Sequence, residues 1–137
     1  MRTINRLTST VLAGVVATML FATLAAAAMV EVKSKDGIGY YLTDDKGMTL
    51  YLFKKDAPGK SVCLAPTGCL ERWPIYFVEK VEPSGGVSPG AFGTITRDDG
   101  KKQTTFKGLP LYYFYNDKEP GDTNGQGLGN VWYTAAP

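Results

Sequence analysis

Along this chain, apolar and polar positions alternate over short segments. Beyond residue 28, apolar residues nowhere recur at helical spacing through three turns. In the run 50–53 the leucines point to one face and the aromatic side chains to the other. Short β-prone segments with frequent Gly and Pro between them predict an all-β domain, a small antiparallel sandwich or barrel. The expected strands are residues 30–33, 38–43, 48–53, 73–78, 92–97, 103–106, 111–115 and 130–134.

Two hairpins follow from the turn residues. The turn 43–47 predicts that 38–43 pairs with 48–53, and the turn 98–101 predicts a second hairpin further along the chain. A single helical turn is expected near 69–72. Aromatic side chains are expected to supply most of the core, because they bury the largest area per residue.

The chain repeats itself at a fixed offset. Tyr51 matches Tyr112, and the aromatic and acidic positions that follow each of them match as well, always 61 residues apart. Such internal similarity indicates a duplicated structural unit. We therefore expect one domain, residues 29–137, built from two related repeats at about 38–78 and 92–137.

The first 28 residues have the layout of a secretory signal peptide. Arg2 and Arg6 form a basic start, residues 11–24 are apolar, and alanines at 25–28 supply the small residues of a cleavage site. We predict a signal helix that is cleaved before Met29, with no stable membrane insertion afterwards. An uncleaved anchor is the alternative, because the apolar stretch approaches the roughly 20 residues that span a bilayer.

Charge and composition exclude several functions. Removing residues 1–28 takes away two arginines and no acid, which leaves 13 basic and 13 acidic residues. A neutral chain without a basic stripe is not typical of nucleic-acid binding. The sequence contains no histidine, so a Ser-His-Asp or Cys-His catalytic set is excluded.

The chain has two cysteines, Cys63 and Cys69. An even pair in a small exported protein predicts a disulfide. Free thiols and a metal site are the alternatives, and a zinc site would need two further ligands in a chain without histidine.

Four segments together carry a resemblance to a known family. They are residues 47–56, the Cys…Gly-Cys…Trp-Pro stretch at 63–74, the stretch Gly-Thr-Ile-Thr-Arg-Asp-Asp-Gly at 93–100, and the long stretch 108–133. They resemble the bacterial "secreted repeat of unknown function", whose members are often called predicted lipoproteins with a Tyr-x-aromatic-x-x-Asp motif. The resemblance covers about 40–137 and implies export and a tandem repeat, with no agreed activity. The chain lacks the lipobox cysteine of lipoproteins, which favours a soluble periplasmic or secreted protein.

The motif residues have two interpretations. In the first they are structural, with the rings packed on one sheet face and the carboxylates accepting backbone N–H groups in the following turn. In the second they form an aromatic and acidic patch that binds a sugar or peptide, with the rings as stacking faces. The candidate binding residues are Tyr51, Phe53, Asp56, Tyr112, Phe114, Asp117 and Trp132.

The loop that begins at Asp122 resembles the front half of a calcium loop. Asp122, Asn124 and Gln126 place oxygen-bearing side chains at alternate positions, Gly127 follows, and Asp117 could add a carboxylate. The back half fails, because position twelve is Tyr133 rather than glutamate. The alternative is that these side chains stiffen a long β connection.

Function remains open between three classes. The favoured hypothesis is an exported, non-enzymatic binding or interaction module without a cofactor, whose partner is an envelope protein or a small ligand. The second is a metal- or redox-associated periplasmic accessory protein. The third is a carbohydrate hydrolase that uses Asp56 and Asp117, which depends on the separation of these two carboxylates.

Overall fold

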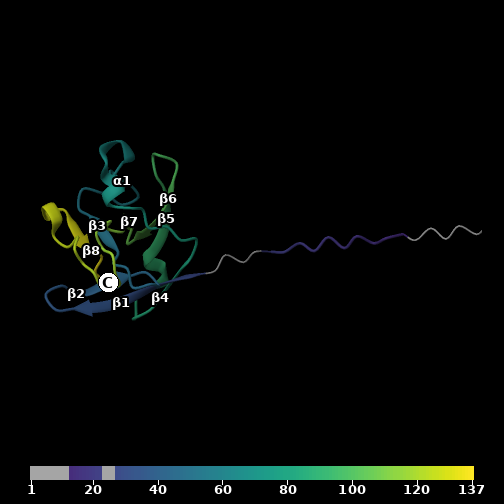
Figure 1. Cartoon of the computed structure of the whole chain (residues 1–137), viewed down its shortest axis with the longest axis horizontal. Coiled ribbons are helices and arrows are strands. Elements are labelled where there is room, and N and C mark those ends of the chain that lie inside the picture. The colour runs from purple at the N-terminus through teal and green to yellow at the C-terminus, as the bar shows by residue number, and fades with distance from the viewer. Residues whose placement is uncertain (1–12, 23–26) are drawn as a thin grey trace, which may run out of the picture.

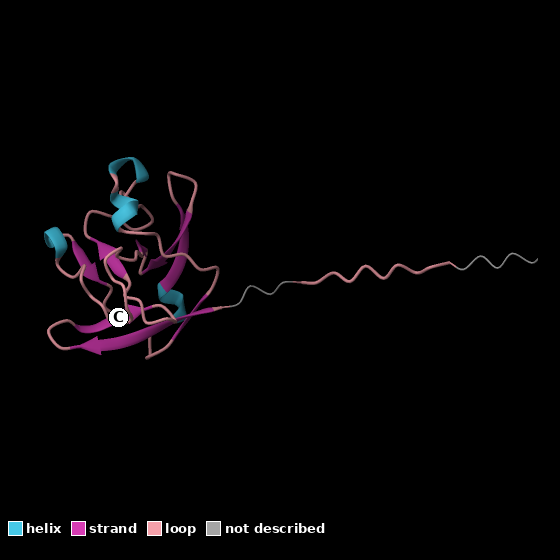
Figure 2. Ribbon diagram, in the orientation of Figure 1, coloured by secondary structure: helices cyan, strands magenta, loops and turns pink. Residues whose placement is uncertain are grey.

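The computed structural model describes residues 13–22 and 27–137. Residues 28–134 contribute three small β-sheets joined by loops and short helical turns (Figures 1 and 2). The all-β prediction is confirmed, but the three sheets do not close into a barrel within the described residues. The strands are β1 (Ala28–Lys35), β2 (Gly39–Thr43), β3 (Tyr51–Phe53), β4 (Val81–Pro83), β5 (Phe92–Thr96), β6 (Lys102–Phe106), β7 (Leu109–Pro110) and β8 (Trp132–Thr134). The helical turns are α1 (Cys69–Arg72) and three 3₁₀ turns, Ala65–Thr67, Pro89–Ala91 and Leu128–Asn130.

The first sheet has the order β2-β1-β4. β1 is longer than predicted and pairs antiparallel with β2. The prediction that 38–43 pairs mainly with 48–53 is therefore wrong, because its main partner is β1. Gly37 and Gly39, both with φ above +75°, form the tight turn that lets β2 return along β1. The turn at 43–47 exists, but it joins β2 to the next segment only through the Thr43–Thr49 bridge and a few backbone bonds.

The second predicted hairpin is confirmed. β5 and β6 pair antiparallel from Phe92 opposite Phe106 to Thr96 opposite Lys102, and Gly100 closes the turn with its N–H on the Arg97 carbonyl. The predicted helical turn at 69–72 is also present, as α1.

Two of the predicted strands, 73–78 and 111–115, are not regular strands. They lie against each other through the Ile75–Tyr112 bridge and the bonds from Tyr113 N to Pro74 O (2.8 Å) and Tyr115 N to Arg72 O (2.8 Å). Pro74 has no N–H to return a bond, so the ladder is interrupted there. The equivalent pair on the other side of the repeat contact, β3 with β8, also joins the two repeats, has no proline and forms a continuous ladder.

The two repeats meet at their matching tyrosines. Tyr51 and Tyr112 face each other in an antiparallel bridge, with Tyr51 N to Tyr112 O at 2.8 Å and Tyr112 N to Tyr51 O at 3.0 Å. The two repeats are therefore arranged about a local two-fold relation at this bridge. The predicted equivalence of 50–53 and 111–115 holds in position, although only the first is a regular strand.

Two clusters of buried side chains form the core. One is mainly aliphatic and includes Leu42, Leu50, Leu111 and Phe106. The other is aromatic and is built around Tyr51, Tyr112 and the side chains that pack on them. The aromatic cluster lies at the contact between the repeats, where the motif residues are located.

The predicted signal peptide falls largely on 1–12 and 23–26, which lie outside the described residues. Residues 13–22 form no helix or strand, and their side chains are exposed. β1 begins at Ala28, one residue before the predicted mature terminus Met29, and the cleavage position stays a prediction. Among the described residues, no helix has the length and apolar character needed to cross a membrane.

Candidate functional site

The motif tyrosines and aspartates form crossed pairs between the repeats. Tyr51 donates its hydroxyl to Asp117 Oδ2 at 2.6 Å, and Tyr112 donates to Asp56 Oδ2, also at 2.6 Å. Each repeat therefore supplies the acceptor for the tyrosine of the other repeat.

The second oxygen of each carboxylate holds the turn that follows it. Asp56 Oδ1 accepts the N–H of Val62 at 2.8 Å, and Asp117 Oδ1 accepts the N–H of Asn124 at 2.9 Å. The prediction that these aspartates accept backbone bonds is confirmed. This geometry favours the structural interpretation of the motif, because the carboxylate oxygens that a ligand would contact already have partners.

Burial shapes the electrostatics of both pairs. Burial raises the pKa of Asp117, and the hydrogen bond from Tyr51 partly opposes that rise. The pKa of Asp56 is raised in the same way, with its hydrogen bond from Tyr112 acting in the opposite direction. Burial, and then the bond to an aspartate, raises the pKa of each tyrosine. Both hydroxyls therefore stay protonated as donors.

Four aromatic rings stack in a row at the contact between the repeats. The order is Phe53, Trp132, Trp73 and Phe114, with neighbouring ring centroids 4.1, 3.7 and 4.4 Å apart. The first two contacts are parallel and the third is tilted by 31°. The stack repeats the two-fold relation, since each repeat contributes one phenylalanine and one tryptophan. Both faces of both indoles are covered by other rings of the protein.

The motif tyrosines flank this stack in edge contacts. Tyr51 meets Trp73 at 5.4 Å and Tyr112 meets Trp132 at 5.2 Å, both with nearly perpendicular rings. The predicted binding residues are thus brought together around one axis. However, their ring faces contact one another, which contradicts the expectation that they serve as open stacking faces.

The two loops that follow the motif break the symmetry. In the first repeat Cys63 forms a disulfide with Cys69, which confirms the predicted pairing. Gly125 occupies the comparable place in the second repeat, and a Cβ there would lie 2.8 Å from Trp73 Cη2 and 2.9 Å from Tyr51 Cε1. The backbone of the second loop therefore lies directly against the aromatic cluster, whereas the first loop covers it with a disulfide.

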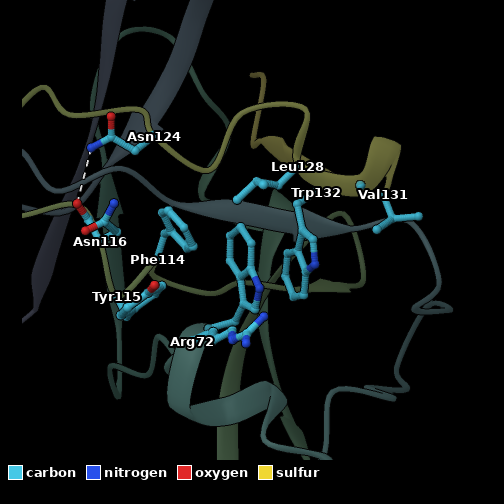
Figure 3. Close-up of a pocket in the computed structure, with 10 residues that line it drawn as sticks. Arg72, Phe114, Tyr115, Asn116, Asn124, Leu128, Val131 and Trp132 are labelled. Carbon is cyan, nitrogen blue, oxygen red and sulfur yellow. Dashed lines mark hydrogen bonds between the residues drawn. The ribbon is translucent and has the colours of Figure 1, made fainter.

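An open pocket of about 460 Å³ lies beside the loop between Asn116 and Val131 (Figure 3). Four aromatic side chains line it: Trp73, Phe114, Tyr115 and Trp132. Of these only Tyr115 is largely exposed, at 52%, whereas Trp73, Phe114 and Trp132 show 8% or less of their surface. The pocket therefore presents mainly the rims of the stacked rings.

Besides the tyrosine hydroxyl, the polar side chains of the pocket are one cation and two amides. Arg72, the last residue of α1, lies along one side of the pocket. Asn116 and Asn124 lie together at one end, where Asn124 Nδ2 donates to the Asn116 carbonyl at 3.2 Å (Figure 3). Leu128, exposed at 43%, lies on the far side of Phe114 from the amides. The lining includes no acidic residue.

The predicted metal ligands are engaged with the protein. Asp122 Oδ2 accepts the N–H groups of Lys118 and Glu119, and Gln126 Oε1 accepts the N–H of Thr134. No group of three or more Cys, Asp or Glu side chains with metal-binding geometry is found in 13–22 and 27–137. The side chains bind the loop, as the alternative interpretation expects, and the cation hypothesis stays untested.

The comparison with protein families agrees with the duplication of the chain. A family model described as "Secreted repeat of unknown function" matches residues 32–76 and again residues 93–136. The chain belongs to this family. Each match covers one repeat, from its first strand region to the end of its aromatic segment. One family unit therefore supplies one tyrosine and one aspartate, and each of these bonds to its partner in the other unit.

The secreted-repeat assignment confirms the resemblance drawn from the sequence and indicates an exported protein. No curated protein and no solved structure matches the chain at a significant level.

Several site residues of this secreted repeat protein were not predicted. Trp73 is the counterpart of Trp132 in the ring stack, but it lies 59 residues before it, so the offset of 61 does not align them. Allowing a gap of two residues would have matched the two tryptophans. Arg72, Tyr115 and Asn116 gave no sequence signal, because they come together only through loops that differ between the repeats.

Proposed function

We propose that this chain is an exported, non-enzymatic module that binds a small ligand in the pocket between Arg72, Asn116 and Leu128. The family description supports the exported part, and a periplasmic or secreted location fits the predicted signal peptide. An envelope protein as the partner is the alternative occupant. The proposal depends on the size and the lining of this pocket.

The pocket has the size and lining of a small-molecule site. Its volume of about 460 Å³ lies within the usual range of roughly 300–1,000 Å³ for such sites. It combines apolar walls with a few convergent polar groups, which is the composition that fixes the orientation of a ligand. The rings beneath it are held by stacking, so the lining is preorganised and little entropy is lost on binding.

We propose no catalytic role, because the carboxylates that a hydrolase would need take part in the crossed pairs. Asp56 and Asp117 are the carboxylates that a hydrolase of this chain would use. Each accepts a tyrosine hydroxyl and a backbone N–H, which argues for a role in holding the repeats together. A metal-associated role is the remaining alternative, and metal analysis of purified protein tests it.

Isothermal titration calorimetry with a pair of matched variants tests the proposal. Leu128→Trp fills the pocket, and Val62→Trp places the same ring on an equally exposed aliphatic position (44% against 43%) that does not line the pocket. The titrants are a panel of sugars, sugar acids, amino acids and short peptides. We expect saturable binding of at least one titrant to the wild-type protein and to Val62→Trp, and its loss in Leu128→Trp. Equal binding to all three proteins would place the ligand elsewhere and refute the proposal.

A further inference from the structure

We infer that the ligand of this pocket is a sugar acid, a saccharide whose carboxylate is held by Arg72 and whose hydroxyls are held by Asn116 and Asn124. This inference rests on the proposed function and names the ligand class of the same site. Three properties of the pocket support it: the ring rims, the unpaired cation and the paired amides.

The first property is the orientation of the rings. Both faces of Trp73 are covered, by Trp132 on one side and Phe114 on the other. An aromatic ring carries negative charge on its faces and positive charge at its edge. A pocket that exposes the rims of stacked rings therefore attracts electron-rich oxygen atoms. The stacked rings do not offer the open faces that a cationic ligand requires, and at Tyr115, the one largely exposed ring of the lining, Lys118 Nζ already lies 5.8 Å from the ring centroid.

The second property is the charge of Arg72. The ion pairs of the described residues involve Lys33, Lys60 and Arg97, and none involves Arg72. No acidic residue lines the pocket to neutralise it. A guanidinium has a planar pair of donors that matches a carboxylate in a bidentate arrangement. The charge complement of this pocket is therefore one anionic group that presents two oxygens, and a carboxylate meets this requirement.

The third property is the pair of amides opposite that charge. Asn124 uses its Nδ2 on the Asn116 carbonyl, so its Oδ1 and the Asn116 side chain are available to a ligand. Amides offer both donors and acceptors, which hydroxyl groups satisfy at once. An aliphatic or aromatic acid would leave these groups without partners at a loss of affinity. Tyr115, half exposed beside them, leaves the ring face that Lys118 does not cover for the apolar side of a sugar.

Tryptophan fluorescence provides the test. The chain has two tryptophans, Trp73 and Trp132, and both line the pocket, so the emission reports its occupancy. The probes are digalacturonic acid and galactobiose, which have the same rings and differ in their carboxylates. We expect digalacturonic acid to bind at least about tenfold more tightly than galactobiose at low salt. The difference should shrink as salt is raised, because the ion pair is near the surface.

Three variants assign the contacts. Arg72→Gln, at an exposed position, should bring digalacturonic acid down to the affinity of galactobiose, and Arg72→Lys should restore part of the difference. Lys55→Gln removes an exposed cation that does not line the pocket and should change neither affinity. Asn116→Ala should weaken both sugars by a similar factor. The melting temperature of each variant shows whether its fold is retained.

The outcomes separate this inference from the proposed function. Equal binding of the two sugars, or no effect of Arg72→Gln, overturns the sugar acid and leaves the binding module in place. The same follows when neither sugar binds but another titrant does and is blocked by Leu128→Trp. A peptide whose terminal carboxylate binds more tightly than digalacturonic acid also overturns it. When no titrant binds and Leu128→Trp changes nothing, both the inference and the proposed function fall.

Discussion

Replacing Tyr51 by phenylalanine tests the crossed pairs most directly. The change removes one of the two donors of Asp117, whose side chain is buried, and also the acceptor of the Gly125 N–H, which lies 3.2 Å from the hydroxyl. A hydrogen bond to a charged group contributes about 1.5–3 kcal/mol, and an unpaired buried N–H costs about 1 kcal/mol or more. We therefore expect Tyr51→Phe to lower the free energy of unfolding by about 3 kcal/mol.

Tyr112→Phe is the matched variant on the other side of the axis. Its partner Asp56 is only half-buried, so water can replace the lost donor, and Ser61 keeps its bond from Arg97. We expect a smaller loss of about 1–2 kcal/mol. Urea denaturation followed by tryptophan emission measures both changes, since Trp73 and Trp132 lie in the stack that the tyrosines flank.

A double-mutant cycle then shows which residues are partners. Tyr51→Phe combined with Asp117→Asn should be less destabilising than the sum of the two single changes, with a coupling of about 1–3 kcal/mol. Tyr51→Phe combined with Asp56→Asn, within the same repeat, should be nearly additive, because no hydrogen bond joins those side chains. Coupling of Tyr51 to Asp56 as strong as to Asp117, or a Tyr112→Phe loss larger than that of Tyr51→Phe, would refute the reasoning.

Four further predictions follow from the same contacts. Burial raises the pKa of Asp117, so its contribution to the free energy of unfolding is complete below about pH 3.9, the pKa of an unfolded chain, and is lost as the pH rises through the higher native pKa. Stability measured against pH should therefore show the advantage of wild type over Asp117→Asn shrinking from pH 3.5 to 7; a growing advantage contradicts the burial argument. Gly125→Ala should destabilise by about 1–3 kcal/mol through its contact with Trp73, while Gly90→Ala, where a Cβ meets nothing closer than 3.6 Å, should be almost neutral in the same denaturation assay. Replacing Cys63 and Cys69 by serine should lower the free energy of unfolding by about 2 kcal/mol, the value for so short a loop, and a neutral result would mean that the loop is ordered without it. Millimolar Ca²⁺ should leave the melting temperature unchanged, because Asp122 and Gln126 already hold backbone groups; a rise matching about 2.7 kcal/mol at 100 times the dissociation constant would favour the cation site.

Sequence reasoning predicted the repeats but not how they face each other. Matching residues such as Tyr51 and Tyr112 indicate that two segments take equivalent positions in the fold, and the bridge between them confirms that much. Similarity does not show whether a side chain bonds within its own repeat or across to the other. The bond from Tyr51 to Asp117 spans 66 positions and depends on how the halves dock, which local patterns do not encode.

The strands were predicted less well where proline and partner choice decided the outcome. β2 pairs with β1 because the turn at Gly37 is tighter than the one predicted further along, and the hydrophobic pattern of β2 fits either partner. The missing N–H of Pro74 interrupts the ladder between the predicted strands 73–78 and 111–115, so neither becomes a regular strand. The pocket could not be predicted from the sequence, because it forms where the loops of the two repeats differ.

The crossed bonds restrict how chains of this kind can gain or lose repeats. In a solenoid each unit contacts its neighbours in the same way, so one unit can be added or deleted at a time. Here the tyrosine of each unit donates a hydrogen bond to the aspartate of the other unit. A third unit added to this chain would bring a buried carboxylate and a buried hydroxyl without partners. Duplication in this architecture should therefore proceed by whole pairs, and longer relatives should carry an even number of units.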